Sequence, residues 1–450
     1  MSLQQTLTAV ESNSISIDVF GLGYVGFPLA VRLASGGFKV RGIDVNPERI
    51  MRLEKNELKE TEMRLKTEYL HCRENGSLEL ANSPLKSDFP KIGIICVHTP
   101  IPDKNIESDL YVKAAIEKFL DTSNEGDLII LESSVAGGTT EKMRGIIENR
   151  GFMVGNNYGL CFCPERIDPQ NKKWNLENIP RIVYCSDDTS FKIVQKIYHA
   201  VNNAHLQRVE SSKIAEIVKS YENAFRLVNI SLINELAILC DKLEISVKDV
   251  INAAKTKPFG FMSFYPSAGA GGHCIPKDPT FLLDVAKKFD FKFSTIENAL
   301  EINFKIPVYI CDSIQRTLEN HNLEKSVLVC GLTYKPNVED MRDSPAFKII
   351  KEFNSRNFKV SAYDPYYKPE LLKKYLKENY MENLEFVFRT DLNDNSLSEV
   401  SCICIVQYHT KTKFRLEEIY EKSLIPFIYD CQSELDKNSN SKTILDSLGS

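Results

Sequence analysis

Residues 16–26 carry the sequence SIDVFGLGYVG, in which a short β-branched and aromatic run meets a Gly-x-Gly-x-x-Gly motif. A helical pattern follows at 27–35, and a second strand is predicted at 39–43. Asp44 ends that strand, near the distance of ~20 residues from the last glycine at which dinucleotide-binding units place an acid. The strand, helix and acid together indicate a Rossmann dinucleotide-binding unit rather than a Gly-rich turn without a nucleotide.

This arrangement also predicts which dinucleotide binds. The turn brings the N-terminus of a helix to a pyrophosphate, and Asp44 can accept hydrogen bonds from the adenosine ribose hydroxyls. Because an acid at this position repels a 2′-phosphate, the predicted cofactor is NAD rather than NADP. The predicted contacts are Gly21, Gly23, Tyr24, Val25, Gly26 and Asp44.

Strand, turn and helix alternate through the rest of the chain in two blocks. Strand-like runs stand at 92–97, 127–131, 160–163 and 182–185, and then at 327–330, 359–363, 402–406 and 427–430. This alternation indicates an α/β fold with two Rossmann-like doubly wound parallel sheets, the second without the full glycine motif. Between the blocks, residues 212–243 show apolar residues at helical spacing without glycine or proline. They predict a long central helix that joins the sheets and can pair across a dimer.

The same pattern suggests the domain boundaries. We expect an N-terminal NAD-binding Rossmann domain at 1–210, a central helical domain at 211–320 and a C-terminal Rossmann-like domain at 321–435. The last segment, 436–450, is polar and rich in Ser and Asn. It is expected to be a flexible tail.

Composition excludes several classes of protein. A chain of 450 residues exceeds one hydrophobic core, and its net charge of -5 argues against a broad nucleic-acid or anionic-membrane surface. A local basic pocket for a phosphorylated ligand remains compatible with that charge. No apolar run reaches the roughly 18 residues that span a bilayer, and the first residues lack a signal pattern. We therefore expect a cytoplasmic protein without nucleic-acid or membrane partners.

The twelve cysteines are scattered through a large chain without an export signal, so they are expected to be reduced. Cys161 with Cys163, and Cys402 with Cys404, alternate in apolar strand-like runs and are expected in the core. No His or Cys cluster has the spacing of metal ligands. The sequence therefore predicts no metal site.

One cysteine stands in a different setting, in the sequence PSAGAGGHCIPKD at 266–278. Its small residues let the backbone approach a ligand closely and present the thiol of Cys274. Lys277 and Asp278 supply a cation and a carboxylate that can lower a thiol pKa or handle its proton. An isolated cysteine is more often a buried core residue, but these neighbours favour a nucleophile. His273 can orient a phosphate or fill the loop, and the structural role is the favoured one.

Lys219 and Asn223 lie four residues apart on the predicted central helix and therefore share one face. By itself such a pair more often marks a solvated stripe than a site. The remaining motifs decide between these two interpretations.

Taken together, the motifs resemble the UDP-glucose/GDP-mannose dehydrogenase family over nearly the whole chain. Its members oxidise the C6 alcohol of a nucleotide sugar to the acid with two NAD, and their C-terminal domain binds UDP. Beside the first glycine motif with Asp44, the matching segments are VHTP at 97–100, SSV at 133–135, GT at 138–139, PER at 164–166, KSYEN at 219–223, GGHCIPKD at 271–278 and GLTYKPNVEDMRDSP at 331–345. The resemblance implies a nucleotide-sugar 6-dehydrogenase.

The resemblance also implies roles for the site residues. Cys274 is similar to the nucleophile that captures the C6 aldehyde as a thiohemiacetal and then holds a thioester. Lys219 and Asn223 resemble oxyanion stabilisers, Asp278 and Ser134 resemble the pair that orders water or takes a proton, and Glu165 resembles the residue that assists hydrolysis. Ser134 stands where threonine is more usual and keeps the hydroxyl. The other implied contacts are Arg49, Thr99, Ser134 and Arg342 for NAD, and Glu165, Arg166, Lys219, Asn223, Phe259, Gly271 and Lys335 for the UDP sugar.

The sugar is predicted from the segment KTKPFGFM at 255–262. Family members that use UDP-glucose or UDP-N-acetylmannosamine generally carry a Pro-Arg pair there, whereas this chain has Phe259 in place of the arginine. With PERIDP at 164–169 and IPR at 179–181, this resembles the UDP-N-acetylglucosamine 6-dehydrogenase branch. An aromatic ring can pack an acetamido methyl group, which favours UDP-N-acetylglucosamine or UDP-N-acetylgalactosamine over UDP-glucose.

Two rival functions remain open. A two-electron hydroxyacid-type dehydrogenase also joins a nucleotide domain to a long helix with a catalytic lysine, but it needs no thiol. A non-catalytic NAD-binding protein needs neither that thiol nor Lys219. The resemblance further implies a homodimer through the central helix and a role in making precursors of surface polysaccharides.

Overall fold

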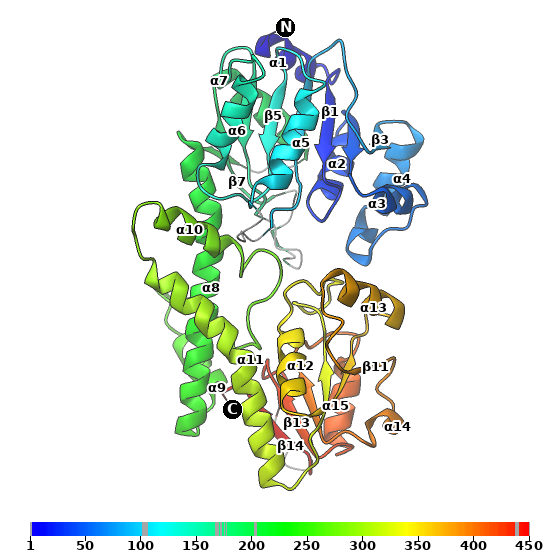
Figure 1. Ribbon diagram of the computed structural model, residues 1–450, viewed down its shortest axis with the longest axis vertical. Coiled ribbons are helices and arrows are strands. Elements are labelled where there is room, and N and C mark those ends of the chain that lie inside the picture. The colour runs from blue at the N-terminus through cyan, green and yellow to red at the C-terminus, as the bar shows by residue number, and fades with distance from the viewer. Residues whose placement is uncertain are drawn as a thin grey trace. The chain divides into compact units, whose positions relative to one another are not determined.

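The computed structural model describes residues 2–100, 107–166, 171, 173–174, 176, 178–201, 205–436 and 441–449, which fold into two compact units (Figure 1). The first unit is built from residues 1–222 and 280–291, and the second from 223–279 and 292–450. Each unit has its own sheet, and each sheet carries helices on its faces.

The sheet of the first unit has eight strands in the order β3-β2-β1-β4-β5-β6-β7-β8. Their bounds are β1 (Ser16–Phe20), β2 (Lys39–Ile43), β3 (Leu78–Ala81), β4 (Lys91–Ile95), β5 (Leu128–Leu131), β6 (Gly159–Phe162), β7 (Arg181–Cys185) and β8 (Leu206–Arg208). All pairs are parallel except β6 with β7. The strand order reverses beside β1, between β2 and β4, and such a switch point is where open α/β sheets bind ligands.

The helices of the first unit include α1 (Leu3–Glu11), α2 (Gly26–Ser35), α3 (Pro47–Glu54), α4 (Lys66–Glu74), α5 (Leu110–Leu120), α6 (Thr139–Glu148) and α7 (Asp188–Val201), with a 3₁₀ turn at Glu60–Leu65. Two separate sets of buried apolar side chains pack in this unit, as expected for a sheet covered on both faces. The charged segment after Pro47 forms two helices separated by the 3₁₀ turn, because α3 ends at Glu54 and α4 begins only at Lys66.

The predicted central helix is confirmed as α8 (Ser212–Leu243), which begins in the first unit and ends in the second. A buried carboxylate anchors its first turns. Glu216 accepts hydrogen bonds from the backbone N–H of Gly138 (2.6 Å) and of Thr140 (2.7 Å), and from the Thr140 hydroxyl (2.7 Å). These donors lie at the N-terminus of α6, where backbone N–H groups have no partner inside the helix and a negative charge is favoured.

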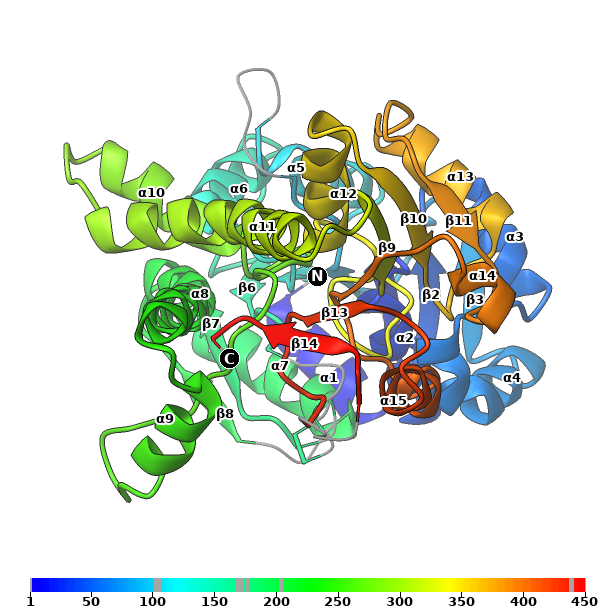
Figure 2. The same cartoon turned by 90° about the horizontal axis from the view of Figure 1, so that it is seen from below.

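The second unit contains a six-stranded parallel sheet in the order β11-β10-β9-β12-β13-β14. The strands are β9 (Ser326–Cys330), β10 (Lys359–Tyr363), β11 (Val387–Arg389), β12 (Cys402–Ile405), β13 (Phe427–Asp430) and β14 (Ile444–Ser447). The helices are α9 (Val247–Ala254), α11 (Ser294–Asn320), α12 (Pro345–Ser355), α13 (Pro369–Glu378), α14 (Asp394–Leu397) and α15 (Lys413–Glu421), while α10 (Asp278–Lys287) is shared by both units. In this unit α11 lies beside the second half of α8, where Tyr309 donates a hydrogen bond to Asp241 (2.7 Å) (Figure 2).

The expectation of a flexible C-terminal tail is wrong for residues 441–449. Strand β14 pairs in parallel with β13, with Ile444 opposite Phe427, and Leu448 is fully buried. The Gly449 carbonyl accepts a hydrogen bond from the Val247 N–H (2.8 Å), which ties the end of the chain to α9. The polar composition of the segment gave no sign of the short strand at Ile444–Ser447. Residues 437–440 lie outside the described part of the chain.

The cysteine predictions agree with the structure. Cys161, Cys402 and Cys404 are buried in strands, Cys163 is buried directly after β6, and none of the twelve cysteines forms a disulfide. Among the described residues, no group of His, Cys, Asp or Glu could hold a metal ion.

Candidate active site

The first glycine motif has the geometry of a dinucleotide turn. Gly21 has φ +87°, and a Cβ there would lie 2.7 Å from the Cys96 carbonyl oxygen. A Cβ on Gly26 would lie 2.0 Å from the Gly21 carbonyl oxygen, so both positions require glycine. A Cβ on Gly23 would meet nothing within 4 Å, which leaves this side of the turn open to a ligand.

Asp44 closes the turn at the end of β2. Its carboxylate accepts from the Leu22 N–H (2.9 Å) and from the Asn46 N–H (2.9 Å), while the residue stays only partly buried. No described side chain caps α2 at Val25, so the N–H groups of its first turn can meet a phosphate. These residues fit NAD.

The other predicted cofactor residues have different surroundings. Arg49 donates to the Leu22 carbonyl (2.8 Å) and pairs with Glu62 (2.6 Å), so its guanidinium braces the glycine turn. Tyr24 is exposed, whereas Thr99, after β4, is buried.

Three predicted residues follow the carboxyl ends of β5 and β6. Ser134 is half-buried after β5. Glu165 follows β6 and accepts from the Arg166 N–H (2.5 Å) and from the Arg181 guanidinium (2.8 Å). Arg166 donates to the Pro180 carbonyl (2.8 Å) and forms an ion pair with Glu222 of α8. The remainder of the predicted PERIDP segment, residues 167–169, lies outside the described residues.

In the second unit, two buried asparagines hold the cysteine loop. Asn234 of α8 accepts from the Ser267 N–H (3.0 Å). Asn303 of α11 accepts from the Ala270 N–H (2.6 Å) and donates to the Ala270 carbonyl (3.0 Å). Because hydrogen bonds made in the protein interior are strong, the loop is held from two helices. Among the described residues, the Asn234 side-chain nitrogen has no hydrogen-bond partner. The sequence analysis missed both residues, since a single asparagine in a helix carries no distinguishing pattern.

The glycines of this loop pack against the segment after β9. A Cβ on Gly271 would lie 2.6 Å from the Asp343 carbonyl oxygen, and one on Gly272 would lie 2.7 Å from the Tyr334 ring. The Gly272 N–H donates to the Arg342 carbonyl (3.1 Å). The second unit therefore brings the Cys274 loop together with the segment that carries Lys335.

Cys274 is the one exposed cysteine of the twelve. Burial lowers the pKa of the Arg342 guanidinium, whereas its hydrogen bonds to Asp340 and the negative charge that a Cys274 thiolate carries raise it. The raising effects are larger, so the pKa of Arg342 lies above its usual value. A cation in electrostatic contact with a thiol stabilises its thiolate form, which is the nucleophile.

Asp278 lies one helical turn after Cys274, and its N–H donates to the Cys274 carbonyl (2.8 Å). Its buried carboxylate accepts from the Asn223 side-chain amide (2.6 Å) and pairs with the Lys277 ammonium (3.5 Å). Lys219 lies one turn before Asn223 on α8. The structure thus joins Asn223, Asp278 and the Cys274 backbone in one cluster and adds Lys277 to it.

The Lys335 segment repeats the design of the first glycine turn. The Gly331 N–H donates to the Tyr363 carbonyl (2.8 Å) and the Leu332 N–H to Asp364 (2.7 Å), as those of Gly21 and Leu22 do to Ile43 and Asp44. This repeat has no open acid, because His409 covers Asp364.

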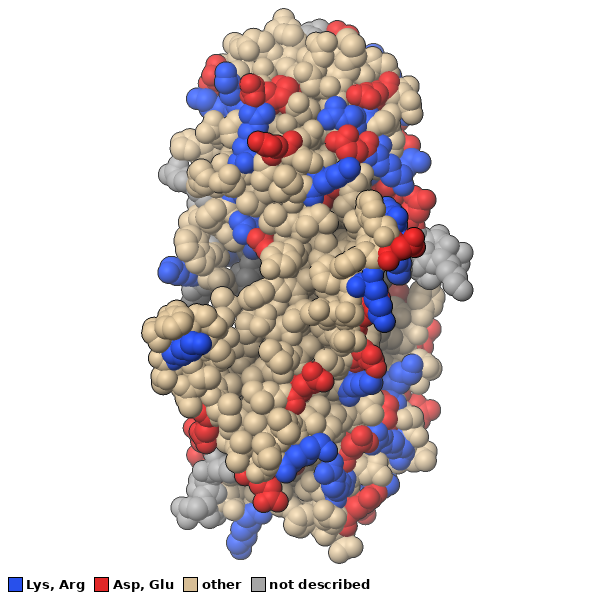
Figure 3. All heavy atoms as spheres, turned by 90° about the vertical axis from the view of Figure 1, so that its left-hand side faces the viewer, with Lys and Arg blue, Asp and Glu red and all other residues tan. Residues whose placement is uncertain are grey.

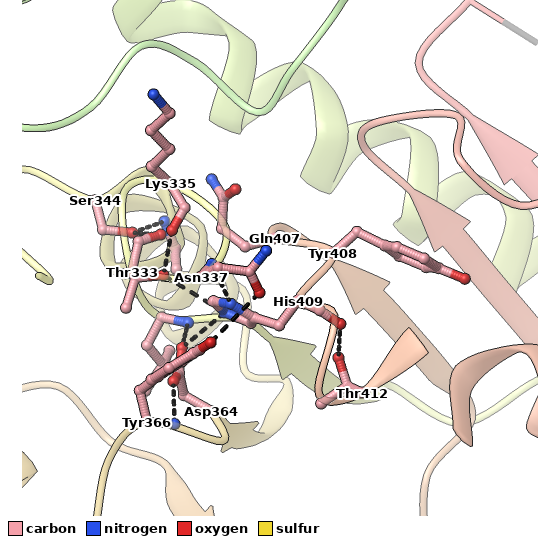
Figure 4. Close-up of polar contacts among 12 residues, drawn as sticks. Thr333, Lys335, Asn337, Ser344, Asp364, Tyr366, Gln407, Tyr408, His409 and Thr412 are labelled. Carbon is pink, nitrogen blue, oxygen red and sulfur yellow. Dashed lines mark hydrogen bonds and ion pairs between the residues drawn. The ribbon is translucent and has the colours of Figure 1, made fainter. Parts of the chain in front are cut away.

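His409 ties that segment to the end of β12. Its Nδ1 accepts from the Asn337 N–H (3.0 Å), which places the ring proton on Nε2, 3.2 Å from the Asp364 carboxylate. Figure 4 shows the Lys335 side chain extending away from this cluster. The sequence analysis did not select His409.

Phe259 lies on an exposed segment after α9, with 72% of its surface accessible, and the Lys257 ammonium lies 5.2 Å from its ring centroid.

Sequence profiles of three domains of one family match the chain in order. The family's NAD binding domain matches residues 15–202, its central domain 213–305 and its UDP binding domain 328–437. The chain belongs to the UDP-glucose/GDP-mannose dehydrogenase family. As a member, it is an NAD-dependent oxidoreductase that acts on a nucleotide sugar, and the resemblance and the cofactor predicted from the sequence are confirmed.

Relatives named as UDP-sugar dehydrogenases match most of this chain. The chain is 33% identical over 415 residues to the UDP-N-acetyl-D-mannosamine dehydrogenase of Methanococcus vannielii, covering 90% of this chain and 89% of the relative. It is 32% identical to the UDP-N-acetyl-D-glucosamine 6-dehydrogenase of Salmonella typhi, covering 80% and 85%. The solved UDP-D-ManNAc dehydrogenase of Pyrococcus horikoshii superposes with a TM-score of 0.84 at 28% identity, covering 97% and 99%.

Proposed function

We propose that this protein oxidises the C6 alcohol of a UDP-N-acetylhexosamine to the uronic acid through a thiohemiacetal and a thioester on Cys274. One observation carries the proposal. Of twelve cysteines, only Cys274 is exposed, and it stands on a loop fixed by Asn234 and Asn303 and followed by the buried Asp278. A reactive thiol must be accessible to solvent and must lie in an ordered, polar environment, and Cys274 meets both conditions.

Two NAD molecules, bound one after the other, would each accept one of the two hydrides that the four-electron oxidation releases. Between them the Cys274 sulfur adds to the C6 aldehyde, and the thiohemiacetal formed is a hydride donor, which the aldehyde itself is not. Lys219 and Asn223 stabilise the developing oxyanion, and the hydrogen bond to Asp278 orients the Asn223 amide before the reaction. Asp278 and Ser134 order water or take a proton, and Glu165 assists the attack of water on the thioester.

Two cationic side chains suit the diphosphate ends of the ligands. Lys335 extends from the segment that contacts the cysteine loop, and we assign it to the UDP diphosphate. Arg342, on the same segment, is assigned to the NAD phosphates. The match of the family's UDP binding domain to residues 328–437 supports the assignment of Lys335.

For the sugar, we propose UDP-N-acetylglucosamine or its C4 epimer, because Phe259 replaces the arginine of the related segment. UDP-N-acetylmannosamine is the second candidate, favoured by the mannosamine dehydrogenases among the relatives. These candidates share the acetamido group, and a relative of each kind is known.

A panel of UDP-glucose and the three UDP-N-acetylhexosamines, compared by kcat/KM, tests this proposal. We expect an N-acetylhexosamine to lead and Phe259→Arg to lower its kcat/KM by about tenfold, as for the loss of one pocket contact. Phe261→Arg, on the same exposed segment, is the matched control and should change kcat/KM less. A lead for UDP-glucose would refute the role given to Phe259.

We also propose that the protein is a cytoplasmic homodimer through α8. Phe225, Leu232, Leu239 and Leu243 are exposed along this helix at spacings that place them on one stripe. Figure 3 views the side on which α8 lies and shows few charged side chains across its middle. Among the described residues α8 is also the one helix long and apolar enough to cross a membrane, with a mean hydropathy of 1.2. Burial of this stripe against a second copy accounts for that apolarity.

Leu232→Glu places a charge in the stripe, and we expect it to shift the sedimentation coefficient from dimer to monomer. Leu371→Glu, at an exposed leucine on α13, is the control and should leave the mass unchanged. A monomeric unmodified protein at assay concentration would contradict the proposal.

A further inference from the structure

We propose that Arg181 and Glu132 are positioning residues for Glu165 in the hydrolysis of the Cys274 thioester. This inference rests on the proposed function. It gives a role to Arg181 and Glu132, two buried charged residues of the first unit that have no other role in the proposed reaction.

The guanidinium of Arg181 is shared by two carboxylates. Arg181 opens β7 and is wholly buried, and it donates to Glu165 (2.8 Å) and to Glu132 (2.9 Å). The Tyr198 ring of α7 lies beneath it, with the centroid 4.6 Å from Cζ, and the Tyr198 hydroxyl also donates to Glu132. Two bridging hydrogen bonds and a ring contact leave the guanidinium one orientation.

The three charged residues differ in access. Arg181 is 0% exposed, Glu132 2% and Glu165 8%, so Glu165 is the member nearest to solvent. Its second oxygen accepts from the Arg166 N–H (2.5 Å), which fixes the carboxylate plane as well. The hydrogen bonds from Arg181 and Arg166 therefore fix the orientation of the Glu165 carboxylate.

A shared arginine suits a carboxylate that must take up a proton. With both carboxylates ionised the cluster has a surplus negative charge, so one can become neutral while Arg181 keeps an anionic partner. In the hydrolysis step, the water oxygen forms a bond to the thioester carbon, the C–S bond breaks, and sulfur leaves as the Cys274 thiolate. Glu165 receives the water proton, and Glu132, when the pH is above its pKa and it is ionised, remains as the counter-ion of Arg181.

The charges around Glu132 support this exchange. Burial, opposed by Arg181 and reinforced by Glu165, raises the pKa of Glu132 to about 7. Burial also raises the pKa values of the thiols of Cys96 and Cys163 and of the Tyr198 hydroxyl, so these neighbours stay neutral. Glu132 is thus the carboxylate beside Arg181 whose charge changes near neutral pH, and above that pH it supplies Arg181 with a second anionic partner.

The test follows one turnover of Arg181→Met, Arg181→Lys and Glu132→Gln by NADH absorbance and by the mass of the Cys274 adduct. In Arg181→Met we expect a rapid NADH burst, an accumulating thioester and hydrolysis slowed by about a hundredfold. Arg181→Lys should recover part of the rate, because one ammonium can pair with Glu165. Glu132→Gln should slow hydrolysis above about pH 7 and remove the fall in the hydrolysis rate near that pH, because Arg181 then has no second anionic partner at any pH.

Each arm has an outcome that overturns the inference. It is wrong if the burst and the hydrolysis fall equally in Arg181→Met, or if the Glu132→Gln pH profile superposes on that of the unmodified protein. If Arg181→Met does not fold, as judged by thermal unfolding, the Glu132→Gln profile decides. Acid formed by Cys274→Ala at the rate of the unmodified protein would refute the proposed function itself, and this inference with it.

Discussion

Replacing Cys274 by alanine is expected to abolish formation of the acid, with a loss of at least about ten-thousandfold in turnover, as for the removal of a covalent nucleophile. The physical reason is that the aldehyde becomes an effective hydride donor only after the Cys274 sulfur has added to it as a thiohemiacetal. Because Cys274 is exposed, its replacement leaves no cavity, and the free energy of unfolding should change little. Acid production is measured by chromatography of the sugar product beside a thermal unfolding curve.

Cys240→Ala is the matched control. Cys240 is buried on α8 beside the second-unit core, so its replacement should lower stability while acid formation continues. Acid formed by Cys274→Ala at the rate of the unmodified protein would exclude covalent capture.

Asp278→Asn is expected to lower kcat by about a hundredfold to ten-thousandfold, the range for a lost acid or base. The change keeps the shape of the side chain and an oxygen for the Asn223 amide, but it removes the carboxylate 3.5 Å from the buried Lys277 ammonium. Breaking a buried ion pair on one side costs about 3–5 kcal/mol, so the free energy of unfolding should fall too. Steady-state kinetics and chemical denaturation measure the two effects.

The double variant Lys277→Met with Asp278→Asn separates the effect on kcat from the effect on stability. Replacing both partners removes the uncompensated charge, so stability should return toward that of the unmodified protein while kcat stays low. Activity that recovers together with stability would show that Asp278 acts only as a structural counter-ion.

Patterns local in sequence predicted most of the fold. The glycine motif predicted β1 and α2, and the absence of glycine and proline predicted α8. Strand β14 could not be predicted in this way, because its few apolar residues stand among polar ones and become a strand only by pairing with β13. The antiparallel β7 likewise follows from its neighbours in the sheet rather than from its own sequence.

The site residues that could be predicted from the sequence are those that belong to a recognisable motif. Cys274 and Asp278 belong to one sequence segment, and Asn223 was found by its spacing from Lys219 and by the resemblance. The residues that hold these groups, Asn234 and Asn303, carry no motif, since their function depends on which backbone the fold brings to them. The same holds for the charged cluster that contains Glu132.

The ratio of NADH formed to sugar acid produced, measured on the preferred UDP-N-acetylhexosamine, tests the central claim most directly. Oxidation of the alcohol to the acid through Cys274 predicts two NADH for each acid and no aldehyde released. One NADH for each sugar, with the aldehyde or ketone as the final product, would contradict the four-electron reaction and favour a simple two-electron dehydrogenase.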